Sequence, residues 1–245
     1  MRKLLKVILP FSLLGKTRTA LSGSALSLSL LLASPVSSQV LAPTPSVAPG
    51  LVEYQIDPEH SSIQFSVRHL GISLVRGEFQ SFKGSFTFPA PDAPADTILK
   101  ARSEASIDVN SISSRVAKRD KHLKSADFLF ASKFPEIKFS ATSVEVLSPE
   151  NLRVKGNLSL RGIEKEVQLE VTGGTRAKDP WGNERVGFLA KTKLNRFDYG
   201  VKWNQLLETG VPVVAPEVEV ELSIEGMRAA ATAPATTEAP SAPAK

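Results

Sequence analysis

Apolar and polar residues alternate along most of the central part of this chain. Val218, Val220, Leu222 and Ile224, for example, are separated by glutamates and a serine. A repeat of two residues is typical of β-strands with one apolar face. The glutamates on the opposite face require water, so we expect a sheet with one solvated side. The other alternating sets are Ile63, Phe65 and Val67; Ile137, Phe139 and Ala141; Val154, Leu158 and Leu160; Val167, Leu169 and Val171; and Val186, Phe188, Ala190, Thr192 and Leu194.

The segment Gly77–Phe88 breaks this regularity, because Phe79 is odd-numbered whereas Phe82, Phe86 and Phe88 are even-numbered. The apolar face therefore switches, and a bulge or bend near residues 80–83 would explain it. A strand that ends and restarts there would explain it equally well. Bends of this kind are how strands curve enough to close a barrel.

Two segments have no alternation. Ser113–Lys124 is charged, contains no Gly or Pro, and places Val116 and Leu123 seven residues apart, so we predict a short helix capped by Ser113 or Ser114. Tyr199–Leu207 predicts a helical turn between the last two strands. About eight or nine strands with short turns favour an all-β fold, either an antiparallel up-and-down barrel or a sandwich. A barrel of about eight strands can enclose one small ligand.

Charge argues against a nucleic-acid-binding role. The formal net charge is +5, but residues 1–42 contain five basic residues and no acidic one, which leaves 25 basic and 25 acidic residues in the remainder. A neutral body lacks the basic excess that binds phosphates. The chain has no cysteine, so disulfides, thiolate metal sites and a thiol nucleophile are excluded.

The two ends of the chain differ from its centre. Residues 1–42 run from basic to apolar to small residues, which is the order of a secretory signal, and an uncleaved membrane anchor is the alternative. A signal predicts a periplasmic or secreted protein. We expect a linker over residues 43–51, a barrel over 52–228, and a disordered tail rich in Ala and Pro over 229–245.

The ionisable residues have two interpretations each. The run Asp57–Ser62 contains an acid, a base and a hydroxyl, as a hydrolase would need, but a local Asp-Pro turn explains it with fewer assumptions. His60 and His69 stand at opposite ends of one predicted strand, roughly 30 Å apart, so we expect no metal site. Arg68 and His69 could contact the polar head of a ligand at a barrel mouth, or serve only a turn and a surface ion pair.

Phenylalanines dominate the predicted inward faces, at positions 65, 79, 82, 86, 88, 139 and 188. They form the core of a filled barrel or line the tunnel of a hollow one, and the alternation alone favours a core. Asp179–Asn183 predicts a hairpin turn. The run Phe128–Phe130, after the predicted helix, would dock that helix or form an apolar lip at an opening.

Several ordered blocks resemble the YceI-like, polyisoprenoid-binding family. The first is YQIDPEHSSIQFSVRHLGISLVRGEF (Tyr54–Phe79), and the others are KRDKHLKSADF (Lys118–Phe128), KFPEIKF (Lys133–Phe139), GNLSLRGIEKEV (Gly156–Val167), DPWGNERVGF (Asp179–Phe188) and LNRFDYGVKWN (Leu194–Asn204). The resemblance implies a lipocalin-like antiparallel up-and-down β-barrel with one inserted short helix. It also implies a periplasmic location and an apolar tunnel that holds an isoprenoid chain, which reverses the preference for a filled core.

We therefore expect a protein that stores or carries a long apolar isoprenoid-type lipid. We expect no catalytic residues and no cofactor apart from that lipid. The expected ligand-binding residues are Phe65, Val67, Phe79, Phe86, Ile137, Phe139, Leu158, Phe188, Arg68 and His69. The alternatives are a hydrolase acting on a lipid or small ester, with His60 or His69 as base, and a stress-linked barrel filled by its own side chains. The expected partner is an isoprenoid or similar lipid and not nucleic acid; a transient membrane contact and a homodimer stay open.

Overall fold

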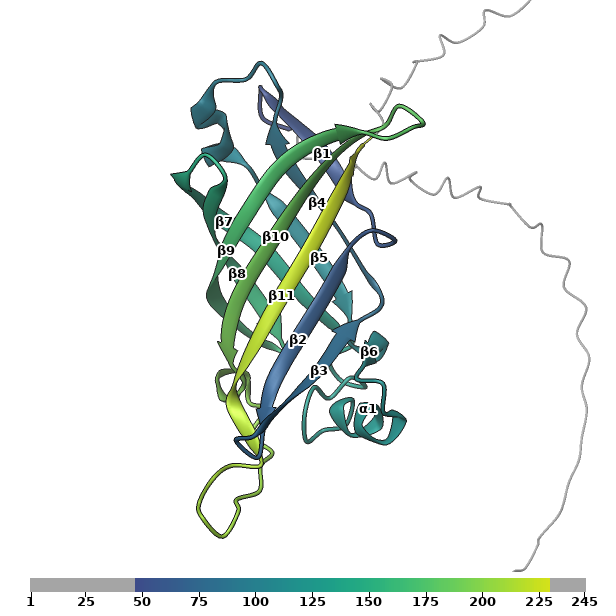
Figure 1. The fold of residues 1–245 in the computed structure, drawn as a ribbon, viewed down its shortest axis with the longest axis vertical. Helices are drawn as coiled ribbons and strands as arrows, with labels where there is room; N and C mark the ends of the chain where they lie inside the picture. The colour runs from purple at the N-terminus through teal and green to yellow at the C-terminus, as the bar shows by residue number, and fades with distance from the viewer. Residues whose placement is uncertain (1–46, 230–245) are drawn as a thin grey trace, which may run out of the picture. The chain divides into compact units, whose positions relative to one another are not determined.

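The computed structural model describes residues 47–229 and shows a single sheet of antiparallel strands wrapped into a barrel (Figure 1). Strand bounds are β1 Leu51–Ile56, β2 Ser62–His69, β3 Ser73–Phe79, β4 Phe82–Pro89, β5 Ser103–Asp108, β6 Ile112–Ser113, β7 Glu136–Ser148, β8 Asn151–Leu160, β9 Ile163–Lys178, β10 Glu184–Asn195 and β11 Val214–Arg228. The helix α1 spans Ala117–Leu123, and 3-10 turns span Ala95–Lys100, Val109–Ser111 and Arg196–Tyr199.

Strand β11 closes the barrel. One edge of β11 pairs with β10 from Glu217 to Met227. The other edge pairs with β2 along the first part of β11 and with β1 near the end of β11, where Arg228 faces Tyr54. Strands β1 and β2 thus follow each other along one position of the ring, as do β3 and β4, and β5 and β6. The ring has eight positions, all antiparallel, which confirms the predicted lipocalin-like barrel with one short helix.

The break predicted within Gly77–Phe88 is an interruption between two strands. Strand β3 ends at Phe79 and β4 restarts at Phe82 in the same direction. The backbone of the two intervening residues is satisfied by the neighbouring segment, since Gln80 N–H donates to Ser111 O at 3.2 Å and Asp108 N–H donates to Ser81 O at 2.9 Å. The strand therefore ends and restarts, and the change of apolar face occurs between the two parts.

The solvated outer face is also confirmed. Glu217, Glu219 and Glu221 of β11 are exposed, and Lys191 and Lys193 of β10 pair with them across the ladder, with Nζ to carboxylate distances of 2.9 to 3.4 Å. Exposed pairs of this kind stabilise a fold by well under about 1 kcal/mol each, so they secure register and solubility more than stability.

The predicted start and cap of the helix are wrong. Ser113 ends β6, α1 begins only at Ala117, and Val116 before it supplies no side-chain cap. Ser114 is instead held by the helix itself, because the Asp120 carboxylate accepts from Ser114 N–H at 2.7 Å and from its hydroxyl. Arg119 Nη2 donates to Ser114 O at 2.7 Å. These contacts hold the residues before α1 outside the helix, with Arg115 at a left-handed φ of 65°, so the helix begins only at Ala117.

The second irregular segment also differs from expectation. A 3-10 turn occurs, but over Arg196–Tyr199 and not over Tyr199–Leu207, and Gly200 ends it with a left-handed φ of 71°. Residues 202–213 form a loop, closed by a bridge between Leu206 and Pro212. By contrast, Asp179–Asn183 is a hairpin turn as predicted, with Asp179 accepting from Trp181 N–H and Asn183 N–H at 3.0 and 2.8 Å.

The predicted signal sequence (1–42), most of the linker and nearly all of the Ala/Pro tail lie outside the described residues. Within residues 47–229, no helix has the length and apolar character needed to cross a bilayer.

Candidate functional site: an apolar cavity inside the barrel

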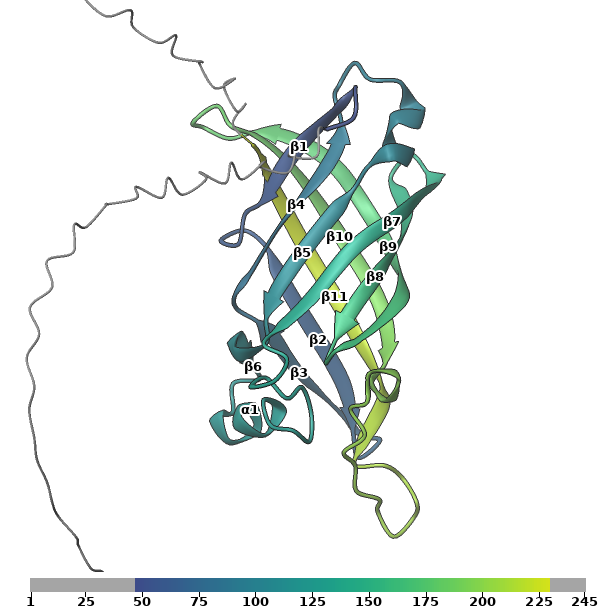
Figure 2. The same cartoon turned by 180° about the vertical axis from the view of Figure 1, so that it is seen from behind.

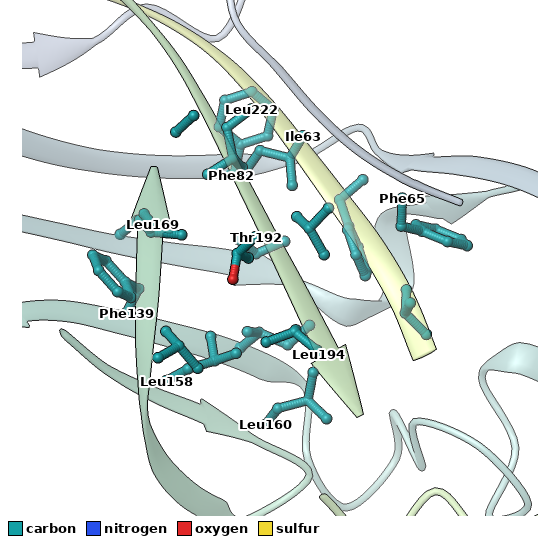
Figure 3. A pocket seen from close by; sticks show the side chains of 18 of the residues that line it. Ile63, Phe65, Phe82, Phe139, Leu158, Leu160, Leu169, Thr192, Leu194 and Leu222 are labelled. Atoms are coloured by element: carbon teal, nitrogen blue, oxygen red, sulfur yellow. The ribbon is translucent and has the colours of Figure 1, made fainter. Parts of the chain in front are cut away.

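A cavity of about 760 Å³ lies inside the barrel. Figure 3 shows some of the inward side chains that line it, which are mostly aliphatic or aromatic. The full set of lining residues comes from every strand of the barrel. Alternation puts every second residue of each strand on this inner face. Many of these side chains, including Val218 and Val220, are only half-buried because they border the hollow and not a packed core.

Glycines on the wall leave room for aromatic rings to lie flat against it. A Cβ atom added to Gly156 would stand 2.5 Å from the Phe139 ring, and one added to Gly226 would stand 2.5 Å from the Phe86 ring. Phe65 covers Gly77 in the same way. Aromatic cover over strand glycines is a known device for pinning register in curved sheets. Here it also keeps three large rings against the wall and away from the axis.

One end of the cavity is bordered by a packed aromatic cluster. Phe188 meets Phe86 and Phe88 edge to face, with ring centroids 5.5 and 5.2 Å apart. Arg176 stacks over Phe88 at 4.7 Å and pairs with Glu184 at 3.1 Å. Fully buried Tyr54 donates to Glu184, and burial, reinforced by this bond, raises the pKa of its hydroxyl.

The other end contains a buried arginine held by backbone. Arg196 is 7% exposed, lines the cavity, and donates to the carbonyls of Val201, Trp203, Val214 and Ala215 at 2.7 to 3.0 Å. Burial lowers the pKa of this guanidinium. Its bonds join the 3-10 turn to the start of β11, so this residue shapes the end of the barrel.

Three rings from separate segments meet beside it. His122 of α1 lies edge to face against Phe128 and Trp203, with centroids 4.9 and 5.0 Å away, and its Nε2 lies 2.9 Å from an Asp127 oxygen. Leu129 also lines the cavity and packs against the buried core. The Phe128–Phe130 run therefore docks the helical segment onto the barrel, as one of the two interpretations expected.

Nine of the ten predicted ligand-binding residues line the cavity, and they share an inward position on a strand. They are Phe65, Val67, His69, Phe79, Phe86, Ile137, Phe139, Leu158 and Phe188. Arg68 is exposed and is not among the lining residues, because it takes the outward position between two inward ones. Whether any of the ten contacts a ligand stays a prediction.

Four polar or amphipathic lining residues near α1 were not predicted from the sequence. Arg119, His122, Arg196 and Trp203 come from the helix, the 3-10 turn and the following loop. These segments have no two-residue repeat, so alternation cannot predict which of their side chains point inward. The only available signal was their presence in the blocks Lys118–Phe128 and Leu194–Asn204.

The run Asp57–Ser62 forms a local turn between β1 and β2. Asp57 accepts from Glu59 N–H at 2.9 Å and lies 2.8 Å from His60 Nδ1. The Ser61 hydroxyl donates to Glu225 O at 3.2 Å and accepts from Glu225 N–H at 2.9 Å. The Ser61 hydroxyl thus both donates to and accepts from the backbone of β11, and these two hydrogen bonds hold the turn against that strand. This structural role favours the turn interpretation.

Arg185 forms ion pairs with three carboxylates beside this turn. Its guanidinium lies 2.6 Å from Asp57, 2.9 Å from Asp179 and 2.7 Å from Glu225. Hydrogen bonding from Arg185 is the main reason why the pKa of Asp57 falls to about 2. Asp57, His60 and Glu225 bring potential ligand atoms within 4.8 Å of one another, but Arg185 already supplies the positive charge between the two carboxylates. The expectation of no metal site stays a prediction.

Comparison with known proteins identifies relatives of this chain. The sequence profile of the YceI-like domain matches residues 54–226. A UPF0312 protein of Shewanella denitrificans is 38% identical over 200 residues, which cover 81% of this chain and 97% of that protein. Protein YceI of Salmonella arizonae is 38% identical over 178 residues, which cover 72% and 87% of the two chains.

Solved structures share the fold at lower identity. Burkholderia cenocepacia BcnA superposes with a TM-score of 0.59 at 18% identity, covering 69% of this chain and 98% of its own. A Campylobacter jejuni YceI protein gives 0.54 at 23% identity, covering 66% and 90%. A polyisoprenoid binding domain from Saccharophagus degradans gives 0.50 at 16% identity, covering 73% and 99%. On the extent of the profile match and the identity to its relatives, the chain belongs to the YceI-like family.

Proposed function

We propose that this protein binds a long apolar isoprenoid-type lipid inside its barrel and stores or carries it. The observation that carries the proposal is the cavity of about 760 Å³ with an almost entirely hydrocarbon lining. A soluble ligand with many polar groups would leave those groups unpaired against such a lining. The Saccharophagus degradans domain of the same fold, named for polyisoprenoid binding, supports the same class of ligand.

The size of the cavity suggests how much of a chain it holds. At roughly 30 Å³ for each water-sized group, a volume of about 760 Å³ takes on the order of 25 methylene or methyl groups. Burial is worth about 0.8 kcal/mol per methylene, so such a chain would approach the practical ceiling of about 18–21 kcal/mol before ordering costs are subtracted. Retention therefore needs no strong polar contact, and a longer prenyl chain would fold back or extend out of the barrel.

The hollow interior weighs against the alternative of a ligand-free structural barrel. A barrel filled by its own side chains would have buried inward residues at native packing density. Instead the aromatic rings lie along the wall and the inward aliphatic residues border a void.

The hydrolase alternative involves Ser61, His60 and His69. Ser61 is bonded to the backbone of β11 and His60 belongs to the turn between β1 and β2, so both are better explained as structural. Of these three residues, His69 is the one that lines the cavity. We therefore propose binding without catalysis, and with no cofactor other than the lipid. Substitution of His60 by Ala should leave lipid binding unchanged.

Export to the periplasm or beyond completes the proposal, on the basis of the signal-like residues 1–42. Fractionation of a Gram-negative host that expresses the full chain should place it outside the cytoplasm with a shortened N-terminus. A full-length cytoplasmic product would contradict export.

Native mass spectrometry of protein purified without detergent tests the ligand directly. The proposed function predicts an added mass, released by organic extraction, whose fragments differ by the 68 Da of an isoprene unit, or uptake of added geranylgeraniol by the empty protein. A bare polypeptide mass together with no uptake would contradict it.

A further inference from the structure

We infer that the α1 end of the barrel is a docking surface for a membrane that contains anionic lipid. The inference rests on the proposed function, since it names the membrane as the partner that supplies or receives the lipid. The surface consists of two adjoining loops with apolar tips and the basic segment that carries α1. Figure 2 shows these parts at the same end of the barrel.

The apolar part is made by the β2–β3 turn and the loop 202–213. The two are bonded to each other, with Leu70 N–H donating to Val213 O at 2.9 Å. Ile72 is 80% exposed and Leu206 is 69% exposed, and Leu74, Leu207 and Val211 are exposed beside them. Isolated exposed apolar residues are ordinary, but four on two adjoining loops and a fifth, Leu74, at the start of β3 form a group large enough to indicate a binding partner.

These tips are presented by ordered backbone. Leu207 N–H donates to Val211 O at 2.9 Å, Gly210 N–H donates to Leu207 O at 2.8 Å, and Leu206 bridges Pro212. Gly210 takes a φ of +80°, which closes the turn. The loop therefore holds its leucines outward by its own hydrogen bonds, and insertion into a bilayer interface would require little further ordering.

The basic part gives the surface its charge. Residues 113–135 contain six basic and two acidic residues, whereas the rest of the chain after residue 42 contains 19 basic and 23 acidic ones. Both acidic residues are engaged locally, Asp120 by Ser114 and Asp127 by His122. Arg115, Lys118 and Lys121 are exposed. Apolar tips beside a basic cluster complement an anionic lipid surface, where both contributions add.

Residues at this end of the barrel also line the cavity. His69, Ser73 and Val213, which border the apolar loops, line the cavity, as do Arg119 and His122 of α1. Contact with a bilayer here would bring the hollow and the hydrocarbon of the membrane together without exposing a prenyl chain to water.

Vesicle flotation of the full chain tests the surface. Wild type should float with vesicles of phosphatidylethanolamine and phosphatidylglycerol, and less with phosphatidylcholine alone. The double variants I72S/L206S and K118E/K121E should each weaken binding to the anionic vesicles at least about tenfold. Control variants L189S and K100E/K178E change exposed residues elsewhere on the barrel and should bind as wild type does. Wild type and all four variants share residues 1–46, so that segment contributes equally to the flotation of each protein.

Uptake of geranylgeraniol from detergent micelles, measured without vesicles, separates this inference from the proposed function. Normal micelle uptake with weakened flotation in the two surface variants supports docking. Equal flotation of surface and control variants, or no flotation of wild type, overturns docking while leaving the proposed function in place. A dimer in light scattering that I72S/L206S dissociates would assign the surface to a second copy and also overturn it. Failure of wild type to take up the alcohol from micelles contradicts the proposed function instead.

Discussion

Single side chains decide how this barrel stays both closed and hollow. Arg185 holds the β1–β2 turn, the β9–β10 turn and strand β11 together through three carboxylates. Gly156 and Gly226 let aromatic rings lie along the wall. The first group secures the outside of the barrel and the second group preserves the space inside it.

The Arg185 network predicts acid sensitivity. Asp57 has a pKa of about 2 in the folded protein, against about 3.9 when unfolded, because Arg185 and His60 bond to it. A lowered folded-state pKa stabilises the protein above about pH 4, and that contribution is lost as the pH falls toward 2. D57N should therefore cost about 1–2 kcal/mol of unfolding free energy at pH 7 and show a smaller decline between pH 4 and 2.

Urea denaturation at several pH values measures this effect. The variant D92N, at an exposed carboxylate, serves as the control and should retain the wild-type decline. Parallel pH profiles for wild type and D57N would contradict the assigned role of the network.

The wall glycines make a second prediction at this scale. In G156A the new Cβ would meet the Phe139 ring at 2.5 Å and the Ser140 carbonyl at 2.6 Å, so the ring must move into the hollow and the strand must shift. We expect a loss of about 1–3 kcal/mol in stability and weaker lipid uptake. The matched variant G187A has its nearest neighbour at 3.9 Å and should change both quantities far less. Equal thermal unfolding of the two variants would refute this explanation.

At the scale of elements, the inserted helical segment is attached by polar contacts of its own. Asp120 and Arg119 bind Ser114, which follows β6, and Phe128 and Leu129 pack inward. The hydrogen bonds place α1 at the end of the barrel, and the apolar pair fixes it there.

Removal of the Asp120 carboxylate should release α1 before the barrel unfolds. D120A leaves Ser114 N–H without its acceptor, which costs about 1–3 kcal/mol and should speed hydrogen exchange over residues 113–124 selectively. K121A, at an exposed position of the same helix, is the control. Uniformly faster exchange across all strands in D120A would show that the segment is not a separate unit.

Sequence reasoning succeeded where structure follows from a local repeat. Alternation predicted β2 and β7 to β11, the face switch between β3 and β4 near Phe79, and the solvated face, and turn chemistry predicted Asp179–Asn183. The alternating sets did not include β1, β5 and β6. It failed at the start of α1, where the side chains of Asp120 and Arg119 bind Ser114 five to six residues earlier. It also failed at the Arg196–Tyr199 turn, where Arg196 bonds to the distant carbonyl of Ala215. A two-residue repeat carries no information about either set of contacts.

Inward and outward positions of the candidate site followed from the same repeat, which explains why Phe65 and His69 line the cavity and Arg68 does not. Alternation could not predict the hollow, because filled and empty barrels have the same alternating pattern. Only the family resemblance indicated a hollow interior. The residues near α1, including His122 and Trp203, lie in segments without a two-residue repeat, so their position in the cavity wall required the structure.

At the scale of the whole molecule, the barrel combines an ion-paired outer wall with a small acidic excess, an apolar interior and a basic end. Closure through β11 removes free sheet edges along most of the ring. Because part of the interior is hollow, closure of the ring and the Arg185 network support the two buried core clusters around Ile137 and Tyr54 in holding the barrel together. A bound lipid would add to that stability by occupying the void.

We propose that the lipid resides in the hollow of the barrel. Thr192 points into the cavity in Figure 3, whereas Ser223 on the neighbouring strand is exposed. The decisive measurement is fluorescence titration with a dansyl-labelled prenyl alcohol of wild type, T192W and S223W, with folding checked by circular dichroism. We expect T192W, which places an indole ring inside the cavity, to lose at least about tenfold in affinity, and S223W to bind as wild type. Unchanged binding by a folded T192W would contradict the claim.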